Sequence, residues 1–196
     1  MQTVINEFDN EITLIYGQPA TGKTTVALMA AIKCCKENKV IFIDTENSFN
    51  IERFKQLKGT NKDLDNIFIV KPVSFEDQLN KVENLTKIKS KSLVIVDSLG
   101  FHYRLNVKED YKKANDALHR QMSILNQISK EIPVILTNQV SYNIDKNKNE
   151  IVGGPKLKNW AKKLIRLEKS PRRLILEKPE LKEFKFEINN DGIYFV

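Results

Sequence analysis

Cysteine is scarce in this chain of 196 residues, which contains only two. These two, Cys34 and Cys35, are adjacent, and inside a helix their side chains would point about 100° apart, too divergent for a disulfide between them. Neither has a second cysteine or histidine at the spacing of a metal site. The composition therefore argues against a disulfide-stapled domain and against a cysteine-based metal centre.

Long apolar runs are also missing. No stretch approaches the roughly 20 apolar residues that span a membrane, and residues 1–10 lack the basic and then apolar layout of a secretory signal. Hydrophobic residues make up 41% and charged residues 29% of the chain, as in soluble globular proteins. With no repeats, linkers or low-complexity segments, the sequence predicts a cytoplasmic protein without membrane contact, folded as one domain over residues 1–196.

Residues 17–24 carry the strongest positive signal. Their sequence, Gly-Gln-Pro-Ala-Thr-Gly-Lys-Thr, fits the phosphate-binding pattern G-x-x-x-x-G-K-[S/T] at every fixed position. A strand-like segment at 11–16 leads into this turn and a helical pattern from 23 to about 37 leads out of it. An ordinary glycine turn before a helix is the alternative, but the succession of strand, turn and helix favours the phosphate-binding loop.

The amides of such a loop and the N-terminus of its helix bind phosphate oxygens, so we predict a nucleoside triphosphate site. Lys23 is expected to reach the β- and γ-phosphates, and the Thr24 hydroxyl is expected to hold Mg²⁺. The predicted nucleotide-binding residues of this segment are Gly17, Gln18, Pro19, Ala20, Thr21, Gly22, Lys23, Thr24 and Thr25.

The rest of the chain alternates between short apolar runs and helical patterns, which predicts an α/β fold with a mostly parallel central sheet flanked by helices. The expected strands are 40–44, 67–70, 93–97 and 133–139, and the expected helices are 51–57, 75–85 and about 108–130. Segments 98–107 and 141–149 read as loops. Closely spaced strands then follow at 164–167, 174–177, 184–188 and 193–196, and these predict antiparallel pairs at the C-terminal end.

Three polar side chains stand where predicted parallel strands end, which is where ligands bind in α/β sheets. Glu46 could orient and polarise the attacking water, or it could simply begin the next helix. Asp97 closes an apolar strand, as does the Mg²⁺-binding acid of phosphate-loop proteins, although a strand-end Asp is common elsewhere. Gln139 could contact the γ-phosphate, or it could be ordinary strand-end polarity. We predict catalytic roles for Glu46, Lys23 and Gln139, and metal binding by Thr24 and Asp97.

Basic residues gather in one stretch. Residues 156–173 contain eight basic side chains against the single acid Glu168, a net charge of +7 that equals the charge of the whole chain. Such a cluster is typical of nucleic-acid binding, and a lysine-rich solvated surface is the alternative. Tyr103 could stack on a base or pack against the protein. The predicted DNA-binding residues are Lys156, Lys158, Lys162, Lys163 and Arg166.

The order of these motifs, Lys23-Thr24, then Glu46, then Asp97, then Gln139, resembles the RecA family of recombinase ATPases. The resemblance runs from about residue 11 to 196, and its segments 153–162 and 172–196 are similar to archaeal RadB proteins. It implies a RecA-like fold, ATP and Mg²⁺ as cofactors, and single- or double-stranded DNA as a partner. In archaeal and eukaryotic members an arginine stacks on adenine, and Arg53 matches it, as expected of a planar guanidinium.

The chain also lacks parts of the longer recombinases. Sixteen residues precede Gly17, so we expect a core domain without an N-terminal DNA-binding domain or the Phe-x-x-Ala segment that joins neighbouring subunits. Strand exchange is then not expected, and self-association should be weak. The sequence predicts a RadB-type DNA-repair protein with slow, Mg²⁺-dependent ATP hydrolysis.

Two other functions remain open. One is a nucleotide-controlled module that docks onto a recombinase or a DNA polymerase and hydrolyses little ATP. The other is a phosphotransferase or a clock-type ATPase, but no arginine-rich lid follows the long helix, and Thr45-Glu46 stands where clock-type relatives carry paired glutamates.

Overall fold

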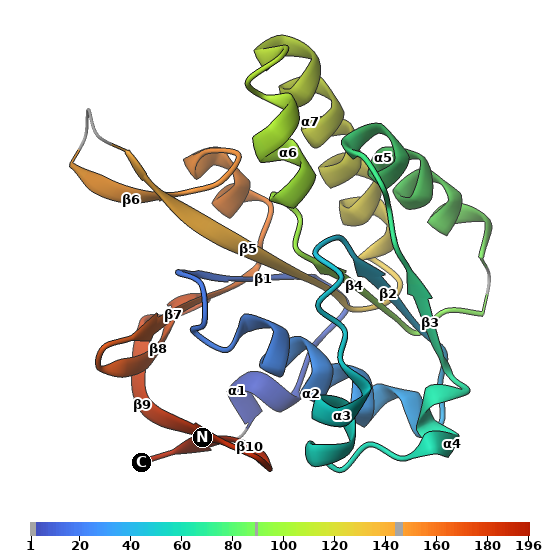
Figure 1. The fold of residues 1–196 in the computed structure, drawn as a ribbon, viewed down its shortest axis with the longest axis vertical. Helices are drawn as coiled ribbons and strands as arrows, with labels where there is room; N and C mark the ends of the chain where they lie inside the picture. Colours follow the sequence, from blue (N-terminus) through green and yellow to red (C-terminus); the bar gives the residue numbers. More distant parts are fainter. Residues whose placement is uncertain (1–2, 89, 144–146) are drawn as a thin grey trace.

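The computed structural model describes residues 3–88, 90–143 and 147–196 and has an α/β fold built on one large mixed sheet (Figure 1). The strand order is β10-β9-β8-β7-β1-β5-β4-β2-β3, and β6 pairs with β5. The strands are β1 (Ile12–Gly17), β2 (Val40–Asp44), β3 (Ile67–Val70), β4 (Leu93–Asp97), β5 (Val134–Asn143), β6 (Lys148–Ile151), β7 (Lys163–Lys169), β8 (Arg172–Lys178), β9 (Lys182–Asn189) and β10 (Gly192–Phe195).

Strands β1 to β5 and β7 run parallel, so their carboxyl ends meet at one edge of the sheet. Gly17 at the end of β1 is level with Gln139 on β5 and with Leu167 on β7, and Asp44 is level with Asp97. The predicted fold class is confirmed, because β8, β9 and β10 are the antiparallel strands of the C-terminal end. Strand β7 pairs antiparallel with β8 as predicted, but its other edge pairs in parallel with β1, which the sequence did not predict.

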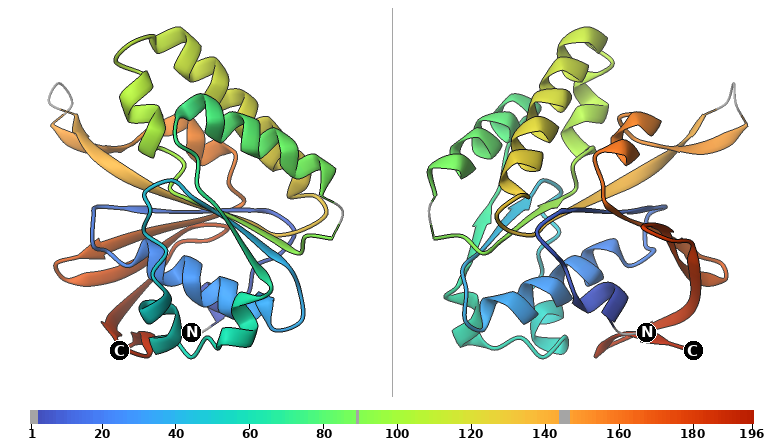
Figure 2. Two further views of the ribbon diagram at one scale, coloured as in Figure 1. Left: turned by 45° about the vertical axis from the view of Figure 1, so that its right-hand side comes forward. Right: turned by 180° about the vertical axis from the view of Figure 1, so that it is seen from behind.

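Helices cover both faces of the parallel strands (Figure 2). Helix α2 lies on one face, and α5, α6 and α7 lie on the other. Among the described residues, no helix combines the length and the apolar character that crossing a bilayer requires. The helices are α1 (Thr3–Asn6), α2 (Lys23–Cys35), α3 (Ile51–Gln56), α4 (Asn61–Leu64), α5 (Phe75–Asn84), α6 (Phe101–Asn106) and α7 (Tyr111–Ile128), with 3₁₀ turns η1 (Leu85–Lys87) and η2 (Pro155–Asn159).

Each buried strand feeds two cores, because successive side chains point to opposite faces of a sheet. On β2, Phe42 packs into the cluster around α2, while Ile41 and Ile43 pack into the cluster beneath α5 and α7. All five residues of β2 and of β4 are buried. Burial on both faces explains why these strands read as continuous apolar runs in the sequence.

Local side-chain chemistry sets where the helices start. Ser74 accepts a hydrogen bond from the amide of Asp77 at the start of α5, and Asp110 does the same for Lys113 at the start of α7. Both contacts satisfy amides that have no partner within the helix. Helix α7, which the sequence predicts at about 108–130, buries an apolar face made of Ala114, Leu118, Met122, Leu125 and Ile128.

Two segments that we predicted to be loops have regular structure. Residues 98–107 contain α6, which begins directly after β4. Residues 141–149 belong to a hairpin, since β5 continues to Asn143 and pairs antiparallel with β6, with Val140 opposite Ile151. Residues 144–146 of the predicted loop lie outside the described residues. Both elements depend on tertiary contacts, because neither segment has strong helical or alternating periodicity of its own.

Candidate nucleotide-binding site

The loop between β1 and α2 exposes backbone amides at the start of a helix. Gly22, the N-cap of α2, has φ 102° in the left-handed region, which favours glycine, and it carries no side chain that could cap the helix. The first intrahelical bond runs from the Val26 amide to the Gly22 carbonyl at 3.0 Å. The amides before it are therefore available to an anion, and the helix dipole favours negative charge there.

Lys23 supplies a charged group inside this loop. Its side chain is buried at 8% exposure, and Nζ donates to the carbonyl oxygens of Gly17 at 3.2 Å and Gln18 at 2.8 Å. Burial lowers the pKa of Lys23, and the nearby carboxylates of Asp97 and Glu46 oppose that shift. A phosphate would give this ammonium the counter-charge that two carbonyl dipoles supply only partly.

Asp97 lies beside Lys23 at the end of β4. It is 3% exposed and accepts hydrogen bonds from the hydroxyls of Thr137 and Thr24, and from Ser48 Oγ at 3.3 Å. Burial raises its pKa, and the bonds from Thr137 and Thr24 partly offset the rise. Asp97 and Thr24 are thus brought together as predicted for a metal pair.

The residues before Glu46 hold its turn in place. The Asp44 carboxylate accepts bonds from the amides of Ser48 at 2.9 Å and Phe49 at 3.0 Å, which closes the turn after β2. Thr45 Oγ1 donates to the Ser98 carbonyl and accepts from the Ser98 amide, both at 2.8 Å. These bonds join the ends of β2 and β4, so Glu46 is presented toward the phosphate loop instead of capping α3, which begins at Ile51.

The carboxylate of Glu46 is held by two donors. Ser98 Oγ donates to Oε1, and Gln139 Nε2 lies 3.0 Å from Oε1 and 3.1 Å from Oε2. The other end of the Gln139 amide, Oε1, accepts a bond of 3.1 Å from Arg104 Nη1 on α6. The three predicted catalytic residues therefore converge at one edge of the sheet, and Arg104 extends the group.

Arg53 lies on α3, near the turn between β9 and β10. Its guanidinium donates to the carbonyl oxygens of Asn190 and Asn189, both at 2.9 Å, and to Gln56 Oε1 at 3.0 Å. All three bonds use the edge of the planar group, and a guanidinium stacks through its faces. Ile188, next to that turn, lines a pocket with Ala20, Gly22, Lys23, Thr24 and Thr25.

The residues present fit ATP and Mg²⁺. The loop offers unpaired amides and a buried lysine, and Asp97 is a buried carboxylate whose pKa is raised by that burial, so a cation beside it would offset the cost of its charge. In the described part of the chain, no group of three or more His, Cys, Asp or Glu side chains could hold a metal. Thr24 and Asp97 would therefore share the ion with phosphate oxygens, as Mg²⁺ sites commonly do.

The predicted DNA-binding residues do not form one surface. Lys162 and Lys163 lie at the amino end of β7, four register positions from the level of Gly17 on the neighbouring strand, and the Lys162 amide donates to Ile12 O at 3.1 Å. Lys163 Nζ donates to the Glu7 carbonyl at 2.7 Å. Lys156 is exposed on η2. The linear cluster is thus split between opposite edges of the sheet.

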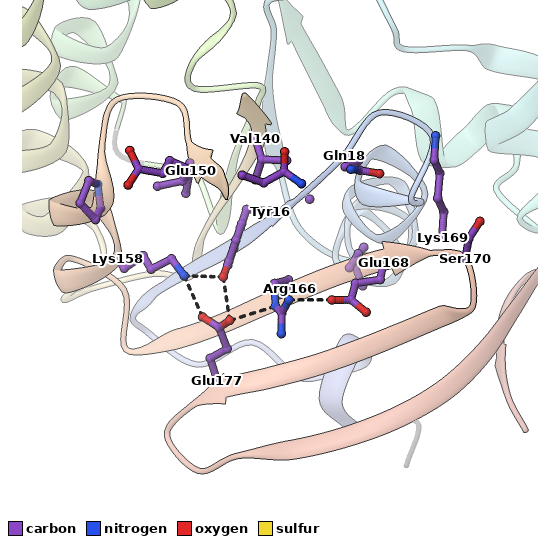
Figure 3. A pocket seen from close by; sticks show the side chains of 15 residues that line it. Tyr16, Gln18, Val140, Glu150, Lys158, Arg166, Glu168, Lys169, Ser170 and Glu177 are labelled. Atoms are coloured by element: carbon purple, nitrogen blue, oxygen red, sulfur yellow. Dashed lines mark hydrogen bonds and ion pairs between the residues drawn. The ribbon is translucent and has the colours of Figure 1, made fainter. Parts of the chain in front are cut away.

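Lys158 and Arg166 lie in a cavity of about 470 Å³ beside the phosphate loop (Figure 3). Glu177 pairs with both, through Lys158 Nζ at 3.1 Å and Arg166 Nε at 3.1 Å, and it accepts the Tyr16 hydroxyl at 2.7 Å. Arg166 also pairs with Glu168 at 2.6 Å. Glu168, within the basic segment, and Glu177, outside it, therefore neutralise these cations.

Sequence reasoning missed several residues of the site. Arg104 and Ser98 fall in a segment that we expected to be a plain loop, and Glu177 lies far from the phosphate loop in sequence. Of the two interpretations of Tyr103, the structure supports packing, since the side chain is 6% exposed and lies edge-on against Phe75 with ring centroids 5.8 Å apart. Only the pairing of β7 with β1 and the formation of α6 bring these side chains to the site.

Comparisons with known proteins agree with this geometry. The family model described as Rad51 matches residues 7–194. The DNA repair and recombination protein RadB of Methanococcus maripaludis is 37% identical over 199 residues, which cover 94% of this chain and 91% of that protein. RadB of Methanocaldococcus jannaschii is 35% identical, with 94% of this chain and 93% of that protein covered.

A solved structure shows the same fold. The crystal structure of the RadB recombinase has a TM-score of 0.81 and 32% sequence identity, covering 96% of this chain and 92% of that one. Identity at this level over nearly the whole length goes beyond a likeness of fold. This chain is a member of the Rad51 family, with a RecA-like fold of the RadB type.

Proposed function

We propose that this protein is a RadB-type, DNA-binding ATPase of DNA repair and homologous recombination, with a slow Mg²⁺-dependent hydrolysis. Members of its family are ATPases. The observation that carries the proposal is the convergence of Lys23, Thr24, Asp97, Glu46 and Gln139 at the carboxyl edge of the parallel strands.

The roles of these residues follow from their chemistry. The loop amides and Lys23 bind the triphosphate, and Thr24 with Asp97 holds Mg²⁺, which when bound neutralises charge on the phosphate oxygens. Glu46 orients the attacking water and accepts its proton. Because Ser98 and Gln139 occupy both oxygens of Glu46, that base is restrained, and slow turnover follows. Arg53 stacks on adenine.

Binding and hydrolysis of ATP test the proposal together. Calorimetry should detect ATP uptake with Mg²⁺ and much weaker uptake in EDTA. Glu46→Gln should lower the hydrolysis rate by about 100-fold or more, the effect of losing a general base, while ATP still binds. Glu52→Gln, an exposed acid on α3, serves as the matched control. Equal rates for Glu46→Gln and wild type would refute the catalytic role.

The DNA-binding part of the proposal rests on the net charge of +7 and on those cations of residues 156–173 that form no ion pair with a carboxylate of the described residues. Lys156 and Lys169 are exposed, and Arg172 donates to the Ala20 carbonyl at 3.4 Å. The latter two flank the phosphate loop. DNA affinity should fall steeply with added salt, because phosphate contacts release counterions.

A nucleotide-controlled interaction module is the second candidate. Edge strand β3 and the segment after it expose apolar side chains, with Phe68 at 48%, Ile69 at 39% and Val73 at 85% exposure. Unpaired strand edges of this kind accept a partner strand. This candidate would be favoured if ATP changes the affinity for a recombinase or DNA polymerase more than it changes the affinity for DNA. Sedimentation would reveal weak self-association.

A further inference from the structure

The amide of Gln139 bridges a base and a cation. Its Nε2 lies 3.0 and 3.1 Å from the two oxygens of Glu46, and its Oε1 accepts from Arg104 Nη1 at 3.1 Å. An amide has one donating end and one accepting end, so a half-turn of the group would set oxygen against carboxylate and NH₂ against guanidinium. Glu46 and Arg104 therefore select the same orientation of Gln139.

Arg104 is itself held in place. Its guanidinium carbon lies 5.8 Å from the centroid of the Phe101 ring, one turn back along α6. Within residues 3–88, 90–143 and 147–196, no carboxylate forms an ion pair with Arg104, so its bond to the amide oxygen is a charge-assisted bond without a competing acid. The guanidinium is half-buried and reachable from solvent.

The start of α6 is fixed against β5. A Cβ on Gly100, the N-cap of α6, would lie 2.5 Å from Asn138 Oδ1, so this close approach requires glycine. Asn138 Nδ2 donates to the Val152 carbonyl at 2.9 Å, and its Oδ1 accepts from the Gln139 amide nitrogen at 2.9 Å. Arg104 and Gln139 are thus held next to each other by the packing of α6 against β5.

From this chain of contacts we infer that Arg104 is a positioning residue that restrains hydrolysis: it holds the Gln139 amide across both carboxylate oxygens of Glu46. With both oxygens engaged, Glu46 has fewer free lone pairs for the attacking water and is a weaker base. Without Arg104, the amide loses one of the two partners that fix its orientation, and Glu46 is free for a larger fraction of the time. The inference rests on the proposed function, because it concerns the same base.

The test is the rate of ATP hydrolysis by the full chain with Mg²⁺ and without DNA. Arg104→Ala should raise kcat by about tenfold, the effect of removing one hydrogen bond to a charged group, and should leave KM for ATP unchanged. Arg104→Lys keeps a cationic donor and should give an intermediate rate. Arg120→Ala, on the neighbouring helix α7 with 66% of its side chain exposed, is the matched control and should equal wild type.

A second background separates positioning from general loosening. In a Gln139→Ala chain, Arg104→Ala should change kcat by less than about twofold, because the two substitutions interrupt the same chain of contacts. An equal rise in both backgrounds would overturn the inference, as would an unchanged or lower kcat in the single variant. Thermal unfolding of each variant checks that the fold is kept.

The side-chain amide signal of Gln139 in a ¹⁵N–¹H spectrum, assigned with Gln139→Ala, gives a readout that needs no hydrolysis. Arg104→Ala should speed the solvent exchange of its NH₂ protons, whereas unchanged exchange would overturn the inference. Failure of the proposed function looks different. Wild-type chain that hydrolyses no more ATP than Glu46→Gln refutes the ATPase proposal, while hydrolysis that Arg104→Ala does not raise refutes only the restraint.

Discussion

The phosphate loop and the basic segment 156–173 are both positively charged in sequence, but they differ in what their charges already touch. The loop presents unpaired backbone amides and Lys23, whose nitrogen donates to the carbonyl oxygens of Gly17 and Gln18. In the basic segment, Lys158, Arg166 and Arg173 are paired with carboxylates. The loop is poised for an anion from outside, whereas much of the segment already has internal partners.

The difference shows that availability to a ligand depends on partners and not on the count of charges. Glu177 is brought onto Lys158 and Arg166 because β8 pairs antiparallel with β7. These side chains are 22% to 40% exposed, so the pairs are partly shielded from water. The network ties Tyr16, the residue before the phosphate loop, to the C-terminal strands.

Replacing Lys23 should have the largest effect on the phosphate loop. Lys23→Ala should lower Mg²⁺-dependent ATP hydrolysis by about 100-fold or more, because the loop loses the one charge aimed at the transferred phosphate. Hydrolysis rates and calorimetric ATP affinity measure the effect. Lys36→Ala, exposed at the end of the same helix, should change neither. A Lys23→Ala chain with wild-type turnover would show that the loop is not the reaction site.

Charge reversal compares basic residues beside the phosphate loop with basic residues at the amino edge of the sheet. Lys169→Glu with Arg172→Glu removes two cations beside the phosphate loop and should weaken DNA binding by about tenfold at 0.1 M salt, with a salt slope smaller by about two. Lys39→Glu with Lys162→Glu makes the same change in net charge just before strands β2 and β7, at the amino edge. Equal losses for the two pairs would mean that total charge, not placement, sets DNA affinity.

Glu177 tests the internal pairing of the second region. Glu177→Gln keeps the shape of the side chain but leaves Lys158 and Arg166 without their shared counter-charge. We expect the free energy of unfolding to fall by about 1–2 kcal/mol, below the cost of breaking a fully buried pair because these groups are partly exposed. Urea denaturation measures it. Glu180→Gln, whose side chain is 64% exposed, should have a smaller effect. An equal loss of stability in both variants would show that the ion pairs of Glu177 do not stabilise the fold specifically.

Replacing Asp97 should change the free energy of unfolding in the opposite direction, toward higher stability. Burial raises the pKa of Asp97, so the folded chain holds that proton more tightly than the unfolded chain, whose Asp pKa is about 3.9. The resulting stability is present below about pH 4 and is lost as pH rises through the folded value. At pH 7 Asp97→Asn should therefore stabilise the nucleotide-free chain by on the order of 1 kcal/mol.

Thermal unfolding between pH 4 and pH 8 checks this prediction. The Tm advantage of Asp97→Asn should shrink toward pH 4, and added Mg²⁺ with ATP should stabilise the variant less than the wild type. An Asp97→Asn variant that is less stable than wild type at every pH would show that the buried Asp97 carboxylate does not lower the stability of the nucleotide-free fold. If Asp97→Asn raises stability and Glu177→Gln lowers it, Asp97 belongs to a ligand-binding site and Glu177 to a network that stabilises the fold.

Much of the site could be predicted because its parts are local. A glycine at a left-handed turn, a lysine one residue into a helix and acids at the ends of apolar strands are all recognisable over a few residues, and parallel strands bring such ends to one edge. The basic segment could not be interpreted in this way. Its charges are screened by Glu177 and Glu183, which reach it only through the pairing of β7, β8 and β9.

The amino-acid sequence alone determined the phosphate loop, the alternation of strands and helices and the family, because each depends on residue type and short spacing. Tertiary structure alone decided which charges remain free and that Arg104 reaches Gln139. The bonds of Gln139 to Arg104 and Glu46 join residues 35 and 93 positions apart, and those of Lys158 to Glu177 and Arg173 to Glu183 join residues 19 and 10 positions apart. Hydrogen bonds act over about 3 Å. Only the packing of α6 beside β5 and the pairing of β8 with β7 and β9 bring these groups within that distance.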